Sequence, residues 1–307
     1  MAALLERIRR ANRPPFRSMS PANARIAYTA AAEVLEPPRA PLPRVQALQL
    51  PGGDGAPRPA RLYAPATDDG LPVLLYLHGG GFTIGNLETH DSLCRQLALR
   101  SGGAVVSLDY RLAPEHPFPA AVDDSWAALR WMAGPGADLL RLDGSRLAVA
   151  GDSAGGTLAA VAALHARDVG LPLALQVLIT PGTTAHADTE SHRRFAEGML
   201  LEAEEIGWFF DHYIPHERRT DWRFAPLLAD EVEGVAPAFV LLAECDPLVD
   251  EGVAYADRLR MAGVPVALDI VRGVTHDFIK MGRALREAGI AQQAIAEALR
   301  QAWSHSA

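Results

Sequence analysis

The stretch Leu147-Ala148-Val149-Ala150-Gly151-Asp152-Ser153-Ala154-Gly155 decides the fold of this 307-residue chain. The apolar run at its start predicts a buried strand over Arg146–Ala150, and the residues after it predict a helix over Ala154–Arg167. Two glycines flank the serine at the turn between strand and helix. A strand, a glycine-flanked turn and a helix in this order are typical of one βαβ step in an α/β fold.

Strands and helices alternate over most of the remaining chain. The other predicted strands are Val45–Leu50, Arg58–Tyr63, Val73–Leu77, Ala104–Leu108, Ala174–Thr180, Ala238–Ala243 and Val266–Val271. The other predicted helices are Thr89–Arg100, Ala120–Met132, Glu202–Tyr213, Val249–Ala262 and Arg283–Trp303, with an amphipathic helix near Leu4, Leu5 and Ile8. The turn residues 51–55 indicate a hairpin between the first two strands. This alternation predicts a mostly parallel sheet with helices on both faces.

Composition excludes several classes of function. The formal net charge is -8 with no long basic run, so nucleic-acid binding is not expected. No window of about 18 apolar residues predicts a membrane span. Two cysteines, Cys94 and Cys245, do not make a disulfide framework, which favours a reducing compartment. We therefore expect a cytoplasmic protein without nucleic-acid or membrane partners.

A second glycine string, His78-Gly79-Gly80-Gly81, follows the predicted strand Val73–Leu77. A serine on a Gly-x-Ser-x-Gly turn is an exposed nucleophile, and a His-Gly-Gly-Gly turn supplies backbone N–H groups for an oxyanion. The residues after Gly81 are Phe-Thr-Ile, which fit neither a P-loop nor a dinucleotide fingerprint. The two strings together predict acyl-transfer chemistry at Ser153.

A serine nucleophile needs a base and a carboxylate that orients the base. His276 follows the last predicted strand, at the same sheet edge as Ser153, so we predict it as the base. Asp246 follows the preceding strand and is the predicted acid, with Asp250 and Glu251 as nearby alternatives in the first turn of the next helix. An unperturbed histidine base predicts a decline in rate below about pH 6.5.

His186, Asp188, Glu190 and His192 are spaced by two residues, as metal ligands can be. They lie in a polar stretch with no further support for coordination, so we interpret them as a solvated loop and expect no metal site.

The motifs together resemble the hormone-sensitive-lipase-like family of microbial carboxylesterases (family IV), which are α/β hydrolases. The resemblance rests on His78–Gly81, Asp109–Glu115, Phe118–Ala121, Gly151–Gly155, Asp246–Glu251 and His276. It implies the α/β-hydrolase fold and a serine esterase that acts on short-chain esters without cofactor or metal. It also implies oxyanion donors at Gly80, Gly81 and Ala154, and a homodimer as one expected assembly. One departure is Asp277, because the family often has glycine after the histidine.

The same resemblance implies a helical cap. We expect residues 1–44 and the insertion 183–223 to form it, and residues 45–182 and 224–307 to form the catalytic domain. The substrate-binding residues that we predict are Phe82, Asp152, Ile206, Trp208, Phe209 and Phe278. The aromatic residues of the insertion either wall a compact acyl pocket or pack within the insertion itself.

The leading hypothesis is therefore hydrolysis of short-chain carboxylic esters through an acyl-enzyme. Amide or formamide hydrolysis by the same triad is an alternative. A second alternative is a non-catalytic small-molecule receptor on this fold. Related receptors lose the catalytic histidine, however, and this chain retains His276.

Overall fold

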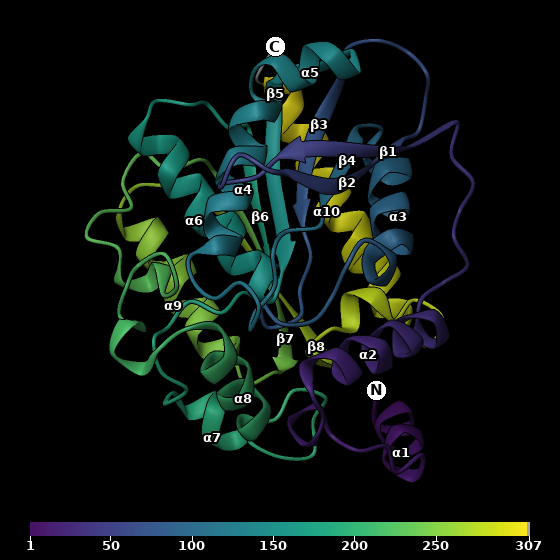
Figure 1. Ribbon diagram of the computed structural model, residues 1–307, viewed down its shortest axis with the longest axis vertical. Helices are drawn as coiled ribbons and strands as arrows, with labels where there is room; N and C mark the ends of the chain where they lie inside the picture. The colour runs from purple at the N-terminus through teal and green to yellow at the C-terminus, as the bar shows by residue number, and fades with distance from the viewer. Residues whose placement is uncertain (306–307) are drawn as a thin grey trace.

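The computed structural model describes residues 1–305 and contains one eight-stranded sheet (Figure 1). The strand order is β1-β2-β4-β3-β5-β6-β7-β8. The bounds are β1 Arg44–Pro51, β2 Pro57–Ala64, β3 Leu71–Leu77, β4 Ala104–Leu108, β5 Leu142–Asp152, β6 Leu175–Ile179, β7 Ala238–Cys245 and β8 Val266–Thr275. β2 runs antiparallel to β1 and β4, and all other pairs are parallel. The predicted fold class and the hairpin of β1 and β2 are confirmed.

Helices cover both faces of the sheet, as the βαβ pattern predicts. One face carries α3 (Asp91–Ser101) and α10 (Arg286–His305), and the other carries α4 (Ala120–Met132), α5 (Pro135–Leu140), α6 (Ala154–Asp168) and α9 (Val249–Met261). Residues 73–77 of β3 and all of β4 are fully buried. Strands covered on both faces are apolar throughout instead of alternating, which is why the sequence shows continuous runs there.

The N-terminal segment contains a helix that the sequence analysis missed. Beyond α1 (Ala2–Arg10), the chain forms α2 (Pro21–Leu35) before the proline-rich connection. The Ser20 side chain caps α2 by accepting a hydrogen bond from the Asn23 backbone N–H at 3.3 Å, and Pro21 occupies the first turn. A serine followed by proline is a helix-start signal that was available in the sequence.

Four helices lie at the sheet edge where the parallel strands end. They are α1, α2, α7 (Glu190–Arg194) and α8 (Ala203–Tyr213), at the bottom of Figure 1. Tyr28 of α2 and Phe209 of α8 belong to one buried apolar cluster, and the Phe16 backbone N–H donates to Glu205 Oε1 at 3.2 Å. Segments 189 residues apart in sequence therefore form one layer over this edge.

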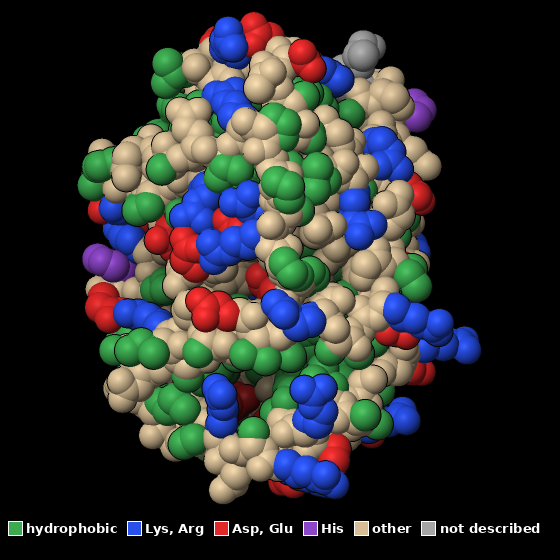
Figure 2. Space-filling view, turned by 90° about the vertical axis from the view of Figure 1, so that its right-hand side faces the viewer, with side chains coloured by type: hydrophobic (Ala, Val, Ile, Leu, Met, Phe, Trp, Pro, Cys, Tyr) green, Lys and Arg blue, Asp and Glu red, His purple; other side chains and the backbone are tan. Residues whose placement is uncertain are grey.

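Basic and acidic side chains are mixed over the face shown in Figure 2. None of the helices within residues 1–305 combines the length and the apolar character needed to cross a bilayer.

Candidate active site

Ser153 lies at the sharp turn between β5 and α6. Its backbone has φ 54° and ψ -124°, a conformation that residues other than glycine rarely adopt. A Cβ on Gly151 would overlap the carbonyl of Gly155, and a Cβ on Gly155 would overlap that of Leu77. The two glycines are therefore required by the close approach of strand, turn and helix, and the turn exposes the serine above the sheet edge.

The predicted nucleophile, base and acid are hydrogen-bonded in a row. His276 Nε2 lies 2.9 Å from Ser153 Oγ, and His276 Nδ1 lies 2.7 Å from Asp246 Oδ2. The other carboxylate oxygen of Asp246 accepts the Leu248 backbone N–H at 2.9 Å. Each of the three follows a strand of the sheet: β5, β7 and β8. This arrangement can deprotonate a serine hydroxyl, hold the imidazole in one tautomer and stabilise its cation.

Opposing influences act on the pKa of His276. Burial alone would lower it, but the carboxylates of Asp246, Asp277 and Asp152 together outweigh burial, with Asp246 contributing most, so the pKa of His276 is raised above its usual 6.5. The raised pKa of His276 differs from the unperturbed value on which the expected decline below about pH 6.5 was based. The decline should begin at higher pH.

The glycine string after β3 leaves backbone donors free at the cavity. Gly80 has φ 123° and Gly81 has φ 57°, and both line the cavity beside Ser153 and Ala154. Within residues 1–305 the N–H groups of Gly80, Gly81 and Ala154 have no protein acceptor. Unpaired N–H groups at the start of a helix and in a glycine turn are suited to an oxyanion. His78 itself is buried, and its ring stacks on Tyr110 at 4.3 Å.

Asp152 does not line the cavity, contrary to the prediction. Its buried carboxylate accepts from the Tyr76 hydroxyl at 2.7 Å and from the Gly79 backbone N–H at 3.1 Å, and it lies 3.1 Å from His90 Nε2. Burial would raise the pKa of Asp152, but the charge of His90 and these hydrogen bonds hold it well below its usual range. Asp152 therefore joins the serine turn to the glycine turn.

The cavity at Ser153 has a volume of about 90 Å³. Three of the predicted substrate-binding residues line it: Phe82, Ile206 and Phe209. Trp208 and Phe278 do not. Trp208 packs outside it against His212 at 4.4 Å between ring centroids, because it lies on another face of α8, and Phe278 is completely buried in the core between the sheet and α10. We considered two roles for the aromatic residues of the insertion. Phe209 forms part of the cavity wall, whereas Trp208 packs within the insertion.

The cavity is also lined by residues that were not predicted to bind substrate. They are Phe16, Tyr28, Ile84, Thr157, Gly182, Thr184, Leu200, Leu201, Glu205, Phe210, Phe224, Leu248 and Asp277. Those from α2 and from residues 200–201 belong to segments without a recognisable motif. Their contribution depends on how the N-terminal segment folds over the sheet edge, which the sequence pattern does not specify.

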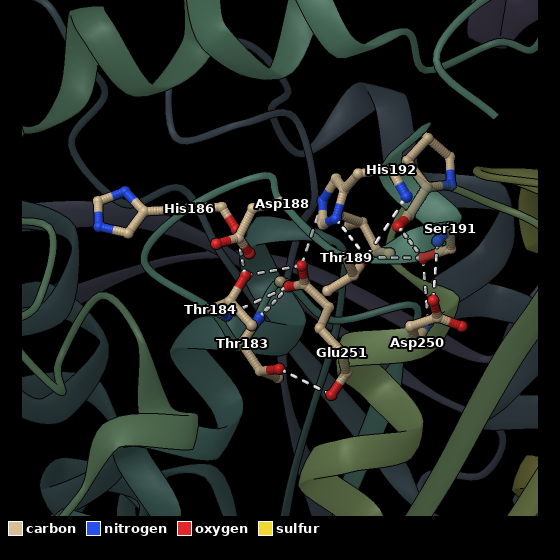
Figure 3. A network of polar contacts seen from close by, with 12 residues as sticks. Thr183, Thr184, His186, Asp188, Thr189, Ser191, His192, Asp250 and Glu251 are labelled. Carbon is tan, nitrogen blue, oxygen red and sulfur yellow. Dashed lines mark hydrogen bonds and ion pairs between the residues drawn. The ribbon is translucent and has the colours of Figure 1, made fainter. Parts of the chain in front are cut away.

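Asp250 and Glu251, the alternative acids, hydrogen-bond to residues of the insertion (Figure 3). The Ser191 backbone N–H donates to Asp250 Oδ2 at 2.7 Å, and the Ser191 hydroxyl donates to the Pro247 carbonyl at 2.6 Å. The Thr184 hydroxyl donates to Glu251 Oε2 at 2.9 Å, and the Thr183 backbone N–H also donates to this carboxylate. Residues 183–191 are thereby fixed to the loop that carries Asp246.

The interpretation of His186, Asp188, Glu190 and His192 as a solvated loop is wrong for His192. Its imidazole is buried, with Nε2 3.3 Å from Glu251 Oε2 and Nδ1 2.6 Å from Thr189 Oγ1. His186 instead points away from this network and contacts His216 (Figure 3). Helix α7 begins at Glu190, so Glu190 and His192 lie in a helix, whereas His186 and Asp188 precede it.

A family model described as an α/β hydrolase fold matches residues 74–280. The chain belongs to this α/β hydrolase family. This span contains both glycine strings, Asp246 and His276, so the match covers the whole hydrogen-bonded row described above.

Several relatives that resemble the chain are named as ester hydrolases or esterases. An ethyl acetate hydrolase from Pseudomonas putida is 46% identical over 262 residues, 83% of this chain and 81% of that protein. Carboxylesterase NlhH from Mycobacterium tuberculosis is 46% identical over 227 residues, 72% of this chain and 71% of that protein. The solved esterase of Pyrobaculum calidifontis superposes with a TM-score of 0.91 at 37% identity and covers 98% of both chains. The prediction of a carboxylic ester hydrolase is confirmed at the level of the enzyme class.

Proposed function

We propose that this α/β hydrolase cleaves short-chain carboxylic esters through an acyl-enzyme formed on Ser153. Ser153 Oγ attacks the ester carbonyl while His276 Nε2 takes its proton. Asp246 holds the imidazole and stabilises the imidazolium. The observation that carries the proposal is the row of hydrogen bonds from Asp246 through His276 to Ser153, at 2.7 and 2.9 Å.

The N–H groups of Gly80, Gly81 and Ala154 stabilise the oxyanion of the tetrahedral intermediate. His276 then protonates the leaving alcohol, activates water against the acyl-enzyme and returns the proton to Ser153. The free N–H groups at the cavity support this role. Removing one such donor typically costs about 10² to 10³ in kcat.

The preference for short acyl chains is supported by the cavity. Its volume of about 90 Å³ is well below the roughly 300 Å³ at which typical ligand pockets begin. We propose residues 1–44 and 183–223 as the cap that closes it, because α2 and α8 both contribute to its wall. The ethyl acetate substrate named for the Pseudomonas putida relative also supports a small ester.

The test combines Ser153→Ala with a chain-length series of p-nitrophenyl esters. The folded variant should lose about 10⁴- to 10⁶-fold in kcat, and the wild-type protein should turn over acetate and butyrate esters faster than decanoate. Unaltered turnover in Ser153→Ala would contradict the nucleophile, and an optimum at long chains would contradict the short-chain preference. Matched anilides, assayed in parallel, test the amide alternative.

A homodimer and a cytoplasmic location remain part of the proposal. Sedimentation equilibrium tests the first, with a mass near 66 kDa against the 32.9 kDa of one chain, and fractionation of the source cells tests the second.

A further inference from the structure

The chain contains one lysine, Lys280, and it is buried beside the proposed base. Lys280 Nζ donates to the Tyr28 hydroxyl and lies 3.5 Å from Asp277 Oδ2. The Tyr28 hydroxyl in turn donates to Asp277 Oδ2 at 3.1 Å. A buried ammonium needs a partner of opposite charge, since desolvation of an unpaired charge is costly. The three side chains, from α2, from the loop after β8 and from the η5 turn (Phe278–Lys280), therefore form one cluster.

Asp277 adopts a left-handed backbone conformation, with φ 64° and ψ 1°. A residue other than glycine in this region costs on the order of 1 kcal/mol or more and persists where surrounding contacts fix it. The contacts of Asp277 with Tyr28 and Lys280 do so here. Because Asp277 directly follows His276, fixing its backbone also fixes the position from which the imidazole reaches Ser153.

The cluster also reaches the reaction cavity. Tyr28, His276 and Asp277 all line it, and the Asp277 side chain is 22% exposed. Lys280 is not among the residues that line the cavity. The negatively charged Asp277 therefore faces the cavity, while the positively charged Lys280 lies outside the cavity lining.

We propose that Asp277, held by Tyr28 and Lys280, is a positioning residue for His276 and stabilises the imidazolium that forms when Ser153 attacks. The inference rests on the proposed role of His276 as the base. It assigns to Tyr28 on helix α2, far from the triad in sequence, an indirect part in the reaction, because Tyr28 acts by holding Asp277.

The electrostatic surroundings agree with this assignment. The Asp246 charge is the main influence that raises the pKa of His276 against its burial, and Asp277 adds to it. Burial would raise the pKa of Asp277, but the charges of Lys280 and His276 keep it low, so Asp277 is ionised. The groups around His276 from the packed elements are Asp152 at the end of β5, Asp246 after β7, Tyr28 on α2, Glu205 on α8, and Asp277 with Lys280 after β8.

Asp277→Asn tests the charge with little change of shape, because asparagine also tolerates the left-handed conformation. Loss of the carboxylate should lower the pKa of His276, so the acid limb of kcat/KM against pH should move down by about one pH unit. The rate on the alkaline plateau should fall about tenfold, because the imidazolium is less stabilised. A role in structure only would lower the rate without moving the limb. The released acid is measured chromatographically, since nitrophenol absorbance itself changes with pH.

Asp269→Asn, at an exposed position of β8, removes the same charge from the strand that leads to His276 and should leave the profile unchanged. Tyr28→Phe is the second variant, which keeps the ring and removes only the hydroxyl between Lys280 and Asp277. It should reduce kcat about tenfold with KM within about twofold of wild type.

A folded Asp277→Asn variant with the wild-type acid limb would overturn the proposal, as would a wild-type kcat in Tyr28→Phe if Asp277→Asn does not fold. Ser153→Ala distinguishes a failure of the proposed function from a failure of the proposed role of Asp277. If it stays active, the proposed function fails. If it is inactive while both cluster variants behave as wild type, only this inference fails.

Discussion

Glu251 and His192 are both buried and lie 3.3 Å apart, carboxylate oxygen to imidazole nitrogen, across the boundary between the insertion and α9. The same carboxylate accepts from Thr183 and Thr184, beside the cavity wall. This one side chain of α9 therefore connects α7 and the loop after β6 to α9.

Glu251→Ala should destabilise the protein by about 2–3 kcal/mol, because it leaves several buried donors without an acceptor. Chemical denaturation measures the free energy of unfolding. Glu190→Ala is the matched control, since that side chain is 74% exposed on α7 and its loss should change stability by no more than about 0.5 kcal/mol. Equal effects of the two substitutions would contradict the connecting role.

Asp246→Asn should reduce kcat by about 10⁴, because asparagine cannot hold the reactive tautomer of His276 or stabilise its cation. Since the neutral imidazole is the base, and Asp246 raises the pKa of His276, the residual activity should extend to lower pH than that of the wild type. The pH profile of kcat/KM checks this. An acid limb that does not move would contradict the assignment of Asp246 over Asp250 and Glu251.

Phe209→Ala should shift the acyl-chain optimum toward longer esters, because the Phe209 ring forms part of the cavity wall. Trp208→Ala, on the same helix but outside the cavity, should leave the optimum in place. Relative kcat/KM over acetate to decanoate esters is the measurement. The pocket assignment fails if the two variants have the same optimum.

Gly155→Ala should abolish activity and lower stability, because its Cβ would overlap the Leu77 carbonyl. Gly207→Ala provides the contrast, since a Cβ at this position on α8 meets nothing within 4 Å. Alanine there should stabilise the protein by up to about 1 kcal/mol without loss of activity. Melting temperature and esterase rate together distinguish the two glycines.

Glu36→Gln should make stability less dependent on pH. Burial raises the pKa of Glu36 to about 8, above its unfolded value near 4.5, and Lys280 opposes this only in part. Between these values the folded protein retains a proton that the unfolded chain has lost, so the stability contribution of Glu36 is present at low pH and decreases as pH rises. The difference in unfolding free energy between variant and wild type should therefore grow in favour of the variant from pH 5 to pH 8. A constant difference would contradict the raised pKa.

The sequence was sufficient for the sheet and for the row from Ser153 to Asp246. Parallel strands end at a shared edge, so the residues after β5, β7 and β8 meet whatever the helices between them contain. The cavity wall was less predictable. Asp152 ends β5 and Phe278 begins the η5 turn after β8, yet both side chains are buried in the core. Asp152 and Ser153 differ in side-chain direction, because successive side chains along a strand point to opposite sides, and Phe278 lies in a turn whose side-chain directions the sequence does not specify. Tyr28 could not be predicted because it lies on a helix placed by tertiary packing.

The ring of Phe209 lies directly against the backbone of Gly81, so closely that a Cβ on that glycine would overlap it. The wall that limits substrate size thus also supports one of the proposed oxyanion donors. An ester large enough to push α8 outward would remove this support as it enters. Discrimination by size should therefore be expressed in the turnover of bound substrate as well as in its binding, so that poor substrates are slow even at saturation.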